Sequence, residues 1–291
     1  MARSWKAGPV SAALRSGLAV LLLALLFLGE ALLTPHLNYA LPFVGYGGTF
    51  RFSSVPVGGA SLSLYWLAQG AGVVCMALLC LSRRRAYGVG AAGAVLTALL
   101  LTLAGYAGAK LLYIAENWER VLREGVGLSG VSFFGTVFFL PLAVSLWALL
   151  LGRKPGEWLD YCTPPTLLML ACIRIGCFMN GCCRGITLWV WQRPVILPSQ
   201  LLECALDLWL LDRLLRAEKR GSCRGGLYVL FMGGYGALRF LVEVTRDTPK
   251  DLMGLSNGQW FSLACMAIWA GAFAVRRARA EKPAHPDDGK E

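Results

Sequence analysis

The chain has 291 residues, of which 56% are hydrophobic and only 15% are charged. A soluble globular domain carries about a quarter charged residues, so this composition excludes an ordinary soluble fold. The formal net charge of +11 would suit a nucleic-acid-binding protein, but long apolar runs recur along the whole chain and the basic residues lie mostly between them. We therefore predict an all-α polytopic integral membrane protein that binds no nucleic acid.

Eight apolar segments are long enough to cross a bilayer. In chain order they are 14–33, 60–82, 88–115, 130–151, 158–179, 198–215, 225–245 and 257–275. A signal peptide is the alternative for the first, because it is short, follows basic residues and is interrupted by Glu30. We find no internal repeat. We predict an N-terminal segment and external loop over 1–59, one membrane domain over 60–275, and a disordered cytoplasmic tail over 276–291.

The basic residues report the orientation of these segments. They gather in the connections 83–85, 153–154 and 213–224 and in both terminal stretches. By the positive-inside rule these regions are cytoplasmic, so both termini are predicted to lie inside. The connections 34–59 and 116–129 then face outward. The first half of 116–129 is predicted to form a short interfacial helix, with Trp118 at headgroup level.

Charged residues inside the apolar segments are the informative ones. Each costs at least about 2.5–3.5 kcal/mol near the bilayer centre, so it usually faces a polar cavity. For Lys110 and Asp207 taken alone, structural pairing is an equally good interpretation. The residues of this kind are Lys110, Asp160, Arg174, Glu203, Asp207, Arg239 and Glu243.

The spacing of some of these charges brings them together. Arg239 and Glu243 are four residues apart, so they share a helix face on which Tyr235 also lies. Two guanidinium groups at similar depth repel unless an anion joins them, and the available anion is a phospholipid phosphate, which arginine binds in a bidentate manner. The predicted topology places five polar residues in the outer half of the membrane, where they can share a cavity: Arg174, Gln200, Glu203, Arg239 and Glu243.

Several motifs resemble one family. The stretch "RIGCFMNGCCRG" at 174–185 is similar to the signature RIGNFINGE-x-x-G of prolipoprotein diacylglyceryl transferases. Other stretches resemble family motifs in the same order: "LYWL", "AGAKLLY", "GVSFFGT", "EWLDY", "LPSQLLE", "YGALRFLVEVTRD" and "LSNGQWFSL". The resemblance covers roughly residues 60 to 275. The first apolar segment is an addition to the family's usual seven.

The resemblance implies a reaction. Such enzymes of the bacterial inner membrane move diacylglyceryl from phosphatidylglycerol to the lipobox cysteine thiol of a prolipoprotein, and glycerol phosphate leaves. No metal, nucleotide or other cofactor is implied. Arg174 and Arg239 would grip phosphate, and Glu243 would orient Arg239. Further residues would line or shape the site, namely Tyr65, Asn180, Gly185, Gln200, Glu203, Tyr235 and Arg246.

The chain departs from the family pattern at its histidines. Phe134 and Leu197 stand where the family commonly has histidine, and the two histidines present, His36 and His285, lie in the outer loop and the tail. A general base must lie within hydrogen-bond reach of its proton. Thiol deprotonation would then fall to Glu203, to Glu243 or to a water beside Arg239. Alternatively, the arginines lower the pKa of the acceptor thiol.

Ten cysteines are present, most of them alone on apolar segments where cysteine packs as a small hydrophobe. Cys177, Cys182 and Cys183 differ because they cluster at the outer membrane edge. A zinc site, a redox pair and simple packing compete here. We favour packing, with Gly181 and Gly185 allowing close approach, and we predict no metal ligands.

The sequence is therefore compatible with three functional hypotheses. The leading hypothesis is a diacylglyceryl transferase. The alternative is a related membrane enzyme that binds lipid phosphate but uses a different acceptor, and the third is a non-catalytic lipid-binding or thiol-redox membrane protein. A thiol-redox role predicts that Cys182→Ser abolishes function while Arg239→Ala is tolerated, whereas a transferase predicts the reverse. A transporter is disfavoured because the chain lacks corresponding broken segments in two halves.

Overall fold

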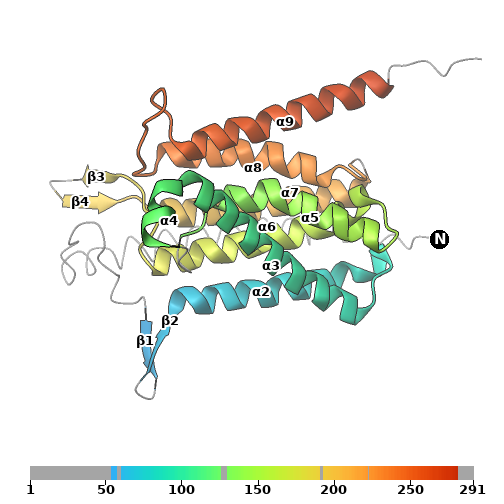
Figure 1. The fold of residues 1–291 in the computed structure, drawn as a ribbon, viewed down its shortest axis with the longest axis horizontal. Helices are drawn as coiled ribbons and strands as arrows, with labels where there is room; N and C mark the ends of the chain where they lie inside the picture. Colours follow the sequence, from blue (N-terminus) through green and yellow to red (C-terminus); the bar gives the residue numbers. More distant parts are fainter. Residues whose placement is uncertain (1–53, 58–59, 126–129, 191–192, 222, 281–291) are drawn as a thin grey trace, which may run out of the picture. The chain divides into compact units, whose positions relative to one another are not determined.

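The computed structural model describes residues 54–280 apart from 58–59, 126–129, 191–192 and 222. The predicted segment 14–33, His36 and His285 lie outside the described residues. Figure 1 labels the elements along the chain. In order they are β1 (Ser54–Val57), β2 (Ala60–Ser63), α2 (Leu64–Arg83), the 3-10 helix η1 (Arg84–Tyr87), α3 (Ala91–Glu116), α4 (Trp118–Glu124), α5 (Phe133–Leu150), α6 (Pro155–Met179), β3 (Thr187–Val190), β4 (Arg193–Ile196), α7 (Ser199–Arg220), α8 (Leu227–Val244) and α9 (Asn257–Ala280).

The helical membrane fold is confirmed. Within the described residues, six helical spans are long and apolar enough to cross a membrane: Leu64–Tyr87, Ala91–Glu116, Phe133–Leu150, Pro155–Met179, Leu227–Val244 and Asn257–Ala278. The predicted segment 198–215 also forms a helix, α7, but it carries too many charges to belong to this set. It buries Glu203 and Asp207 inside the protein, as expected of charged groups within a membrane domain.

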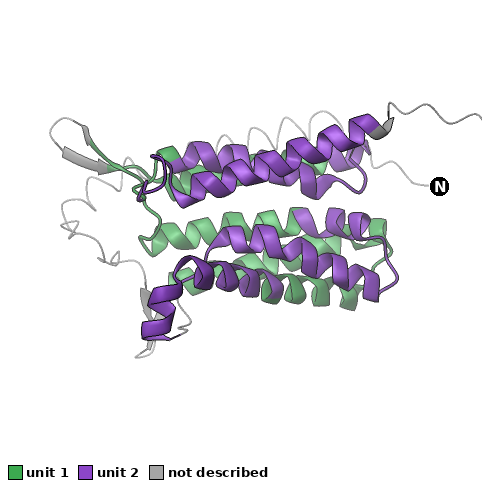
Figure 2. Ribbon diagram, turned by 45° about the horizontal axis from the view of Figure 1, so that its top comes forward, with its two compact units in different colours: residues 1–103, 164–216, 244–248 green, residues 104–163, 217–243, 249–291 purple. Residues whose placement is uncertain are grey.

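The described chain divides into two compact units, shown in different colours in Figure 2. Of the described residues, unit 1 comprises 54–103, 164–216 and 244–248. Of the described residues, unit 2 comprises 104–163, 217–243 and 249–280. Each unit is built from segments distant in sequence. The prediction of a single domain over 60–275 is not tested by this division.

Close helix packing in unit 1 depends on small residues. A Cβ added to Gly72 of α2 would lie 2.7 Å from the Met169 sulfur and 3.0 Å from the Cys172 Cβ of α6, so the absence of a side chain at Gly72 allows this close approach. Two antiparallel hairpins, absent from the sequence prediction, accompany the helices: β1 pairs with β2, and β3 pairs with β4 in the register Thr187↔Ile196. The second hairpin leads the chain from the end of α6 to the start of α7.

In unit 2, two of the charged residues in apolar segments, Asp160 and Lys110, have structural hydrogen bonds. The carboxylate of Asp160 accepts hydrogen bonds from the backbone N–H of Leu227, at 2.8 Å, and from that of Gly225. It therefore satisfies N–H groups at the start of α8, which lack partners within the helix. Lys110 donates to the backbone oxygen of Gly130 at 3.1 Å. Structural pairing is thus the role that the structure supports for both side chains.

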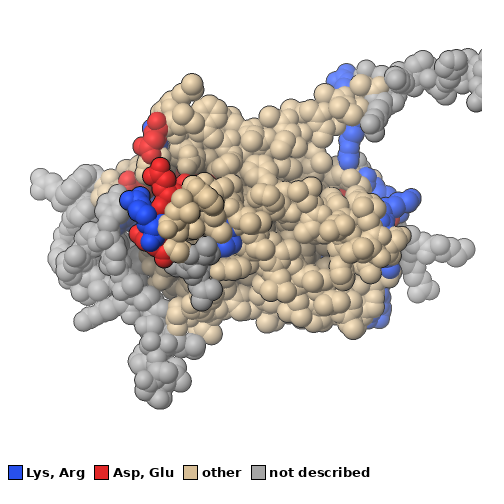
Figure 3. All heavy atoms as spheres, viewed as in Figure 1, with Lys and Arg blue, Asp and Glu red and all other residues tan. Residues whose placement is uncertain are grey.

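On the surface, charged side chains avoid the middles of the helices. On the face drawn in Figure 3, Lys, Arg, Asp and Glu gather toward helix ends, and the surface over the helix middles is uncharged. Many large apolar side chains of the described helices are exposed, including Leu103 and Leu142 at 66% and Leu146 at 60%. Such exposure suits a lipid environment, because hydrocarbon tails solvate leucine as well as a protein core does.

Candidate active site

A buried ion pair joins α6 to α7 in unit 1. The Arg174 Nη2 lies 2.9 Å from Glu203 Oε1, and the two side chains are only 7% and 4% exposed. Removing either partner would leave an uncompensated buried charge, which is strongly destabilising. The pair holds a guanidinium inside the protein near the end of α6, the place that the sequence analysis proposed for a phosphate-binding group.

The end of α6 is a Schellman motif. Gly181 has a φ of +69°, its N–H donates to Phe178 O at 3.1 Å, and the N–H of Cys182 donates to Cys177 O at 3.1 Å. This 6→1 and 5→2 pattern satisfies the last carbonyls of the helix and folds the chain back over its final turn. As a result, Cys182 lies beside Cys177, and its thiol contacts the Cys177 carbonyl oxygen at 3.6 Å.

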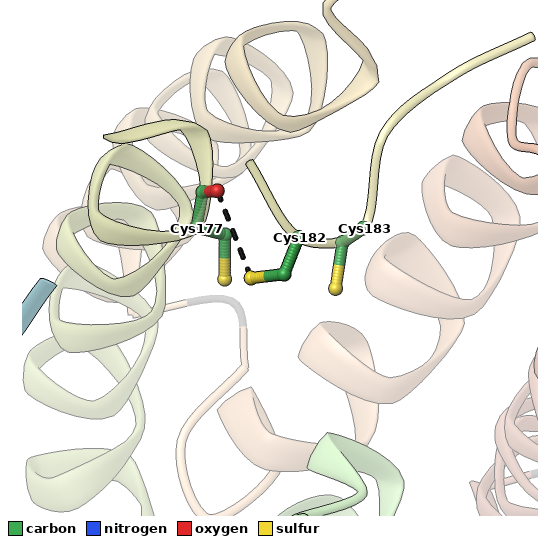
Figure 4. A group of neighbouring side chains, drawn as sticks. All are labelled: Cys177, Cys182 and Cys183. Atoms are coloured by element: carbon green, nitrogen blue, oxygen red, sulfur yellow. Dashed lines mark hydrogen bonds between the residues drawn. The ribbon is translucent and has the colours of Figure 1, made fainter. Parts of the chain in front are cut away.

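The next residue adds a third sulfur. Cys183 has a φ of +60°, a region that non-glycine residues seldom occupy. The sulfur atoms of Cys177, Cys182 and Cys183 all lie within 4.8 Å of one another, and Figure 4 shows them on the same side of the loop. Cys177 is buried, Cys182 is half-buried and Cys183 is exposed. The packing interpretation did not anticipate this convergence.

The loop thiols differ in acidity. Hydrogen bonds from the thiols of Cys177 and Cys182, reinforced by the positive charges of Arg246 and Arg174, hold the pKa of Cys183 well below its usual value. The pKa of Cys182 is raised, chiefly because of its hydrogen bond with Cys183, burial and the negative charge of Cys183, although its contact with Cys177 acts in the opposite direction. Cys183 is therefore the thiol of this group that ionises first.

Gly185 packs closely against two other segments of the chain, 197–199 and 245–246. Its N–H donates to Leu197 O at 3.0 Å, and it forms an antiparallel bridge with Arg246. A Cβ at this position would lie 2.4 Å from Leu197 O and from Ser199 Oγ. Ser199 itself donates to Thr245 O at 2.9 Å. Only glycine fits here, which explains the glycine that ends the signature at 174–185.

Three other predicted site residues lie around the end of α6 and the following loop, which carries Cys182 and Cys183. Gln200 of α7 donates from Nε2 to Cys182 O at 2.7 Å and is buried. The Asn180 side chain hydrogen-bonds to Cys182. Tyr65 of α2 packs against Gly176, where a Cβ would lie 3.3 Å from its ring. The structure thus gathers the unit 1 residues predicted for the site around the end of α6.

A second buried ion pair lies in unit 2. Arg239 Nη2 is 2.6 Å from Glu243 Oε2 on α8, with side chains 8% and 3% exposed. The four-residue spacing predicted this contact, and the structure confirms it. Tyr235, on the same face, is 1% exposed and stacks on Phe231 with ring centres 5.5 Å apart. This pair and the Arg174–Glu203 pair belong to different units, so the expected shared cavity remains a prediction.

Glu243 is held by a group that the sequence alone did not reveal. The Ser256 hydroxyl donates to Glu243 Oε1 at 3.0 Å and accepts from the N–H of Gln259 at 3.2 Å. The Gln259 side-chain oxygen accepts in return from the N–H of Ser256 at 3.0 Å. This reciprocal arrangement is a capping box at the start of α9. The Ser-x-x-Gln pattern in "SNGQW" predicts the cap, but only the fold shows which carboxylate it contacts.

Gly258, within the same cap, also depends on the position of Glu243. A Cβ on Gly258 would lie 2.9 Å from the Glu243 carboxyl carbon and from Oε1. The carboxylate therefore rests against a backbone position that only glycine fits easily. Together, the cap hydroxyl and this contact restrict the carboxylate, which in turn fixes the guanidinium of Arg239.

Phe134 belongs to an aromatic cluster rather than to a polar group. It is 5% exposed, and its ring lies 5.3 Å from that of Phe261 and 6.0 Å from that of Tyr235. Aromatic pairs at these separations contribute about 0.5–1.5 kcal/mol beyond their burial. The position where the family resemblance places a histidine therefore serves packing in this chain.

Comparison with known proteins agrees with the motifs. A family model described as prolipoprotein diacylglyceryl transferase matches residues 54–275. A phosphatidylglycerol–prolipoprotein diacylglyceryl transferase of Methylobacillus flagellatus is 32% identical over 197 residues, covering 62% of this chain and 76% of the relative. One of Dehalococcoides mccartyi is 28% identical over 199 residues with the same coverage of each chain. A protein named phosphatidylglycerol–prolipoprotein diacylglyceryl transferase 2, of Clostridium perfringens, is 26% identical over 224 residues, covering 70% of this chain and 87% of the relative.

Proposed function

The chain belongs to the prolipoprotein diacylglyceryl transferase family, and on that premise we propose how its buried arginines serve the reaction. It is a multi-pass protein of the bacterial inner membrane, and it transfers diacylglyceryl from phosphatidylglycerol to the lipobox cysteine of a prolipoprotein. The observation that supports the assignment of roles is the presence of two arginines, each buried in its unit and each paired with a buried glutamate.

The reaction creates charge where arginines are useful. A thiolate sulfur attacks the glyceryl carbon that carries the phosphate, the carbon–oxygen bond breaks, and glycerol phosphate leaves with the bonding electron pair. A phosphodiester monoanion thereby becomes a phosphomonoester that gains a further negative charge. Fixed cations that contact this group in the transition state more strongly than in the ground state accelerate the step. We assign this role to Arg174 and Arg239.

The two glutamates are assigned supporting roles. Before lipid binds, Glu203 and Glu243 neutralise their arginines, because an unpaired guanidinium in a membrane interior would be costly. Glu243 also keeps the planar group of Arg239 in one orientation, helped by Ser256. Tyr65, Asn180, Gly185, Gln200, Tyr235 and Arg246 are proposed to line or shape the binding sites for phosphatidylglycerol and for the lipobox peptide.

The test uses the purified full chain in phosphatidylglycerol nanodiscs with a synthetic lipobox peptide, and mass spectrometry follows the added diacylglyceryl group. Arg174→Lys and Arg239→Lys keep the charge but lose the planar donor set. We expect each to slow transfer roughly 10²–10³-fold, the usual loss for a removed transition-state donor. Arg120→Lys is the control, since Arg120 pairs with Glu124 in an exposed position.

Two outcomes would contradict these assignments. Transfer by Arg239→Lys at the wild-type rate would remove that arginine from the proposed mechanism, and an equal loss in Arg120→Lys would show that the effect is not local. Consumption of phosphatidylglycerol by a folded wild type that leaves the peptide unmodified would favour the alternative of a different acceptor. The aromatic environment of Phe134 is the observation that keeps this alternative worth testing.

A further inference from the structure

The proposed reaction needs an acceptor thiolate, and the structure offers a way to make one. Phe134, at the family's histidine position, has no titratable group and lies among aromatic rings. The three sulfur atoms at the end of α6 converge in the same unit as Arg174. We propose that Cys177, Cys182 and Cys183 bind a thiophilic divalent ion of the zinc class, and that the acceptor thiol coordinates to the fourth position of this ion. This inference rests on the proposed function.

The distances suit such a site. In a regular tetrahedral or trigonal complex with metal–sulfur bonds of about 2.3 Å, the sulfur atoms lie about 3.8–4.0 Å apart. The sulfur atoms of the three cysteines already lie within 4.8 Å of one another. Cys177 is supplied by the helix and the other two by the loop, so rotation of the loop side chains closes the remaining difference of less than about 1 Å.

The pattern of exposure leaves one side of the site open. Cys177 is buried, Cys182 is half-buried and Cys183 is exposed, so an ion bound among them would be accessible from the side of Cys183. Zinc sites that act on a substrate have three protein ligands and an open fourth position, whereas structural zinc sites are closed by four. A three-sulfur set open on one side therefore matches a substrate-binding ion.

Nearby positive charge suits a thiolate-rich complex. A divalent ion with three thiolates carries one negative charge, and a fourth thiolate adds another. The guanidinium groups of Arg174 and Arg246 both attract the thiolate of Cys183, and both side chains are buried. Because Glu203 already neutralises Arg174, it is chiefly Arg246 that offsets the charge of the complex at the edge of the membrane.

The geometry favours this inference over packing and over a disulfide. A cysteine that only packs is expected to be buried, yet Cys183 is exposed and has a φ of +60°. A disulfide would use two of the sulfurs and leave the third unexplained. Convergence of all three from a helix end and a tight loop is what a metal site requires.

The chemical step balances without an oxidant. Coordination of the acceptor thiol to the ion releases its proton to solvent, because metal-bound thiols are deprotonated. The thiolate sulfur then donates an electron pair to the glyceryl carbon, the carbon–oxygen bond breaks, and its electron pair leaves with glycerol phosphate. The product is a thioether, a weaker ligand than a thiolate, so it dissociates and the fourth position becomes available again.

The first measurement uses the metal alone. The full chain, purified in detergent and fully reduced, is titrated with Cd(II), whose thiolate charge-transfer absorption reports coordination. We expect one ion per chain. Cys177→Ser, Cys182→Ser and Cys183→Gly should each weaken binding at least tenfold, since even outer-shell changes cost 10–100-fold. Glycine at 183 tolerates the positive φ, so that variant keeps the fold. Cys223→Ser removes a half-buried thiol of unit 2 and should not alter binding.

The second measurement links the ion to transfer. Chelation should abolish modification of the lipobox peptide, and Zn(II) should restore it. Arg239→Lys should lose transfer but retain Cd(II) binding, so failure of the catalytic roles is distinguishable from failure of the metal site. A wild type that transfers diacylglyceryl but binds no Cd(II) after reduction overturns the metal site. One that binds Cd(II) yet transfers equally well after chelation overturns activation of the thiol by the metal.

Discussion

Removing the hydroxyl of Ser256 is the sharpest test of how Arg239 is positioned. In Ser256→Ala, Gln259 loses the oxygen that caps its N–H, and Glu243 loses a hydrogen bond at 3.0 Å. Loss of an N-cap costs about 0.5–2 kcal/mol, and loss of a hydrogen bond to a charged group about 1.5–3 kcal/mol. The two sum to about 2–5 kcal/mol of stability. If the lost hydrogen bond to Glu243 destabilises the transition state by its full energy, the rate falls roughly 10–100-fold.

Thermal unfolding in detergent measures the first effect, and the lipobox peptide assay measures the second. Ser256→Thr keeps a hydroxyl and should retain both properties. Ser262→Ala is the matched control, because that buried serine of α9 donates only to Gly258 O within its own helix, a bond of little value to stability. If Ser256→Ala lowers stability while its folded fraction transfers diacylglyceryl at the wild-type rate, the chain of contacts from Ser256 to Arg239 does not serve the reaction.

Three further outcomes are expected. Gly185→Ala places a Cβ 2.4 Å from Leu197 O, so it should cost about 1–3 kcal/mol and lower the unfolding temperature, whereas an unchanged temperature would mean that the backbone yields there. Phe134→Ala should cost about 3–5 kcal/mol, measured in the same way, and a smaller loss would question the aromatic cluster. Cys183, whose pKa is lowered, should remain reactive toward iodoacetamide as the pH falls to neutral, while Cys182, whose pKa is raised, should lose reactivity first; peptide mapping by mass spectrometry reads both.

The parts of the molecule that depend on local sequence were predictable. Long apolar runs dictate helices in lipid because every backbone polar group must be paired within the segment, and the predicted boundaries of α5 and α8 lie within a few residues of those observed. The contact between Arg239 and Glu243 follows from a helical spacing of four. Both inferences need no knowledge of how helices pack.

The contacts between distant segments were not predictable. Residue spacing cannot say that Arg174 of α6 meets Glu203 of α7 rather than another acid, since that depends on how the two helices face each other. The hairpin of β3 and β4 is short, and a proline interrupts it at Pro194, so strand signals are weak there. Likewise, the cap of α9 is readable as a pattern, but its contact with Glu243 is tertiary.

The loop after α6, which carries Cys182 and Cys183, is intermediate between local and tertiary structure. One substitution tests the turn that forms this loop separately from its thiols. Gly181→Ala removes no thiol but forces a Cβ into the left-handed region at a φ of +69°, at a cost of about 1–2 kcal/mol. The Schellman motif that turns Cys182 back onto Cys177 would loosen, so Cd(II) binding should weaken although the thiol count is unchanged. Gly221→Ala is the control: that glycine follows α7 with a φ of +67°, and nothing lies within 4 Å of its added Cβ, so it bears the same backbone cost far from the sulfurs in sequence. Equal Cd(II) affinity in both variants would mean that the Schellman turn does not assemble the site.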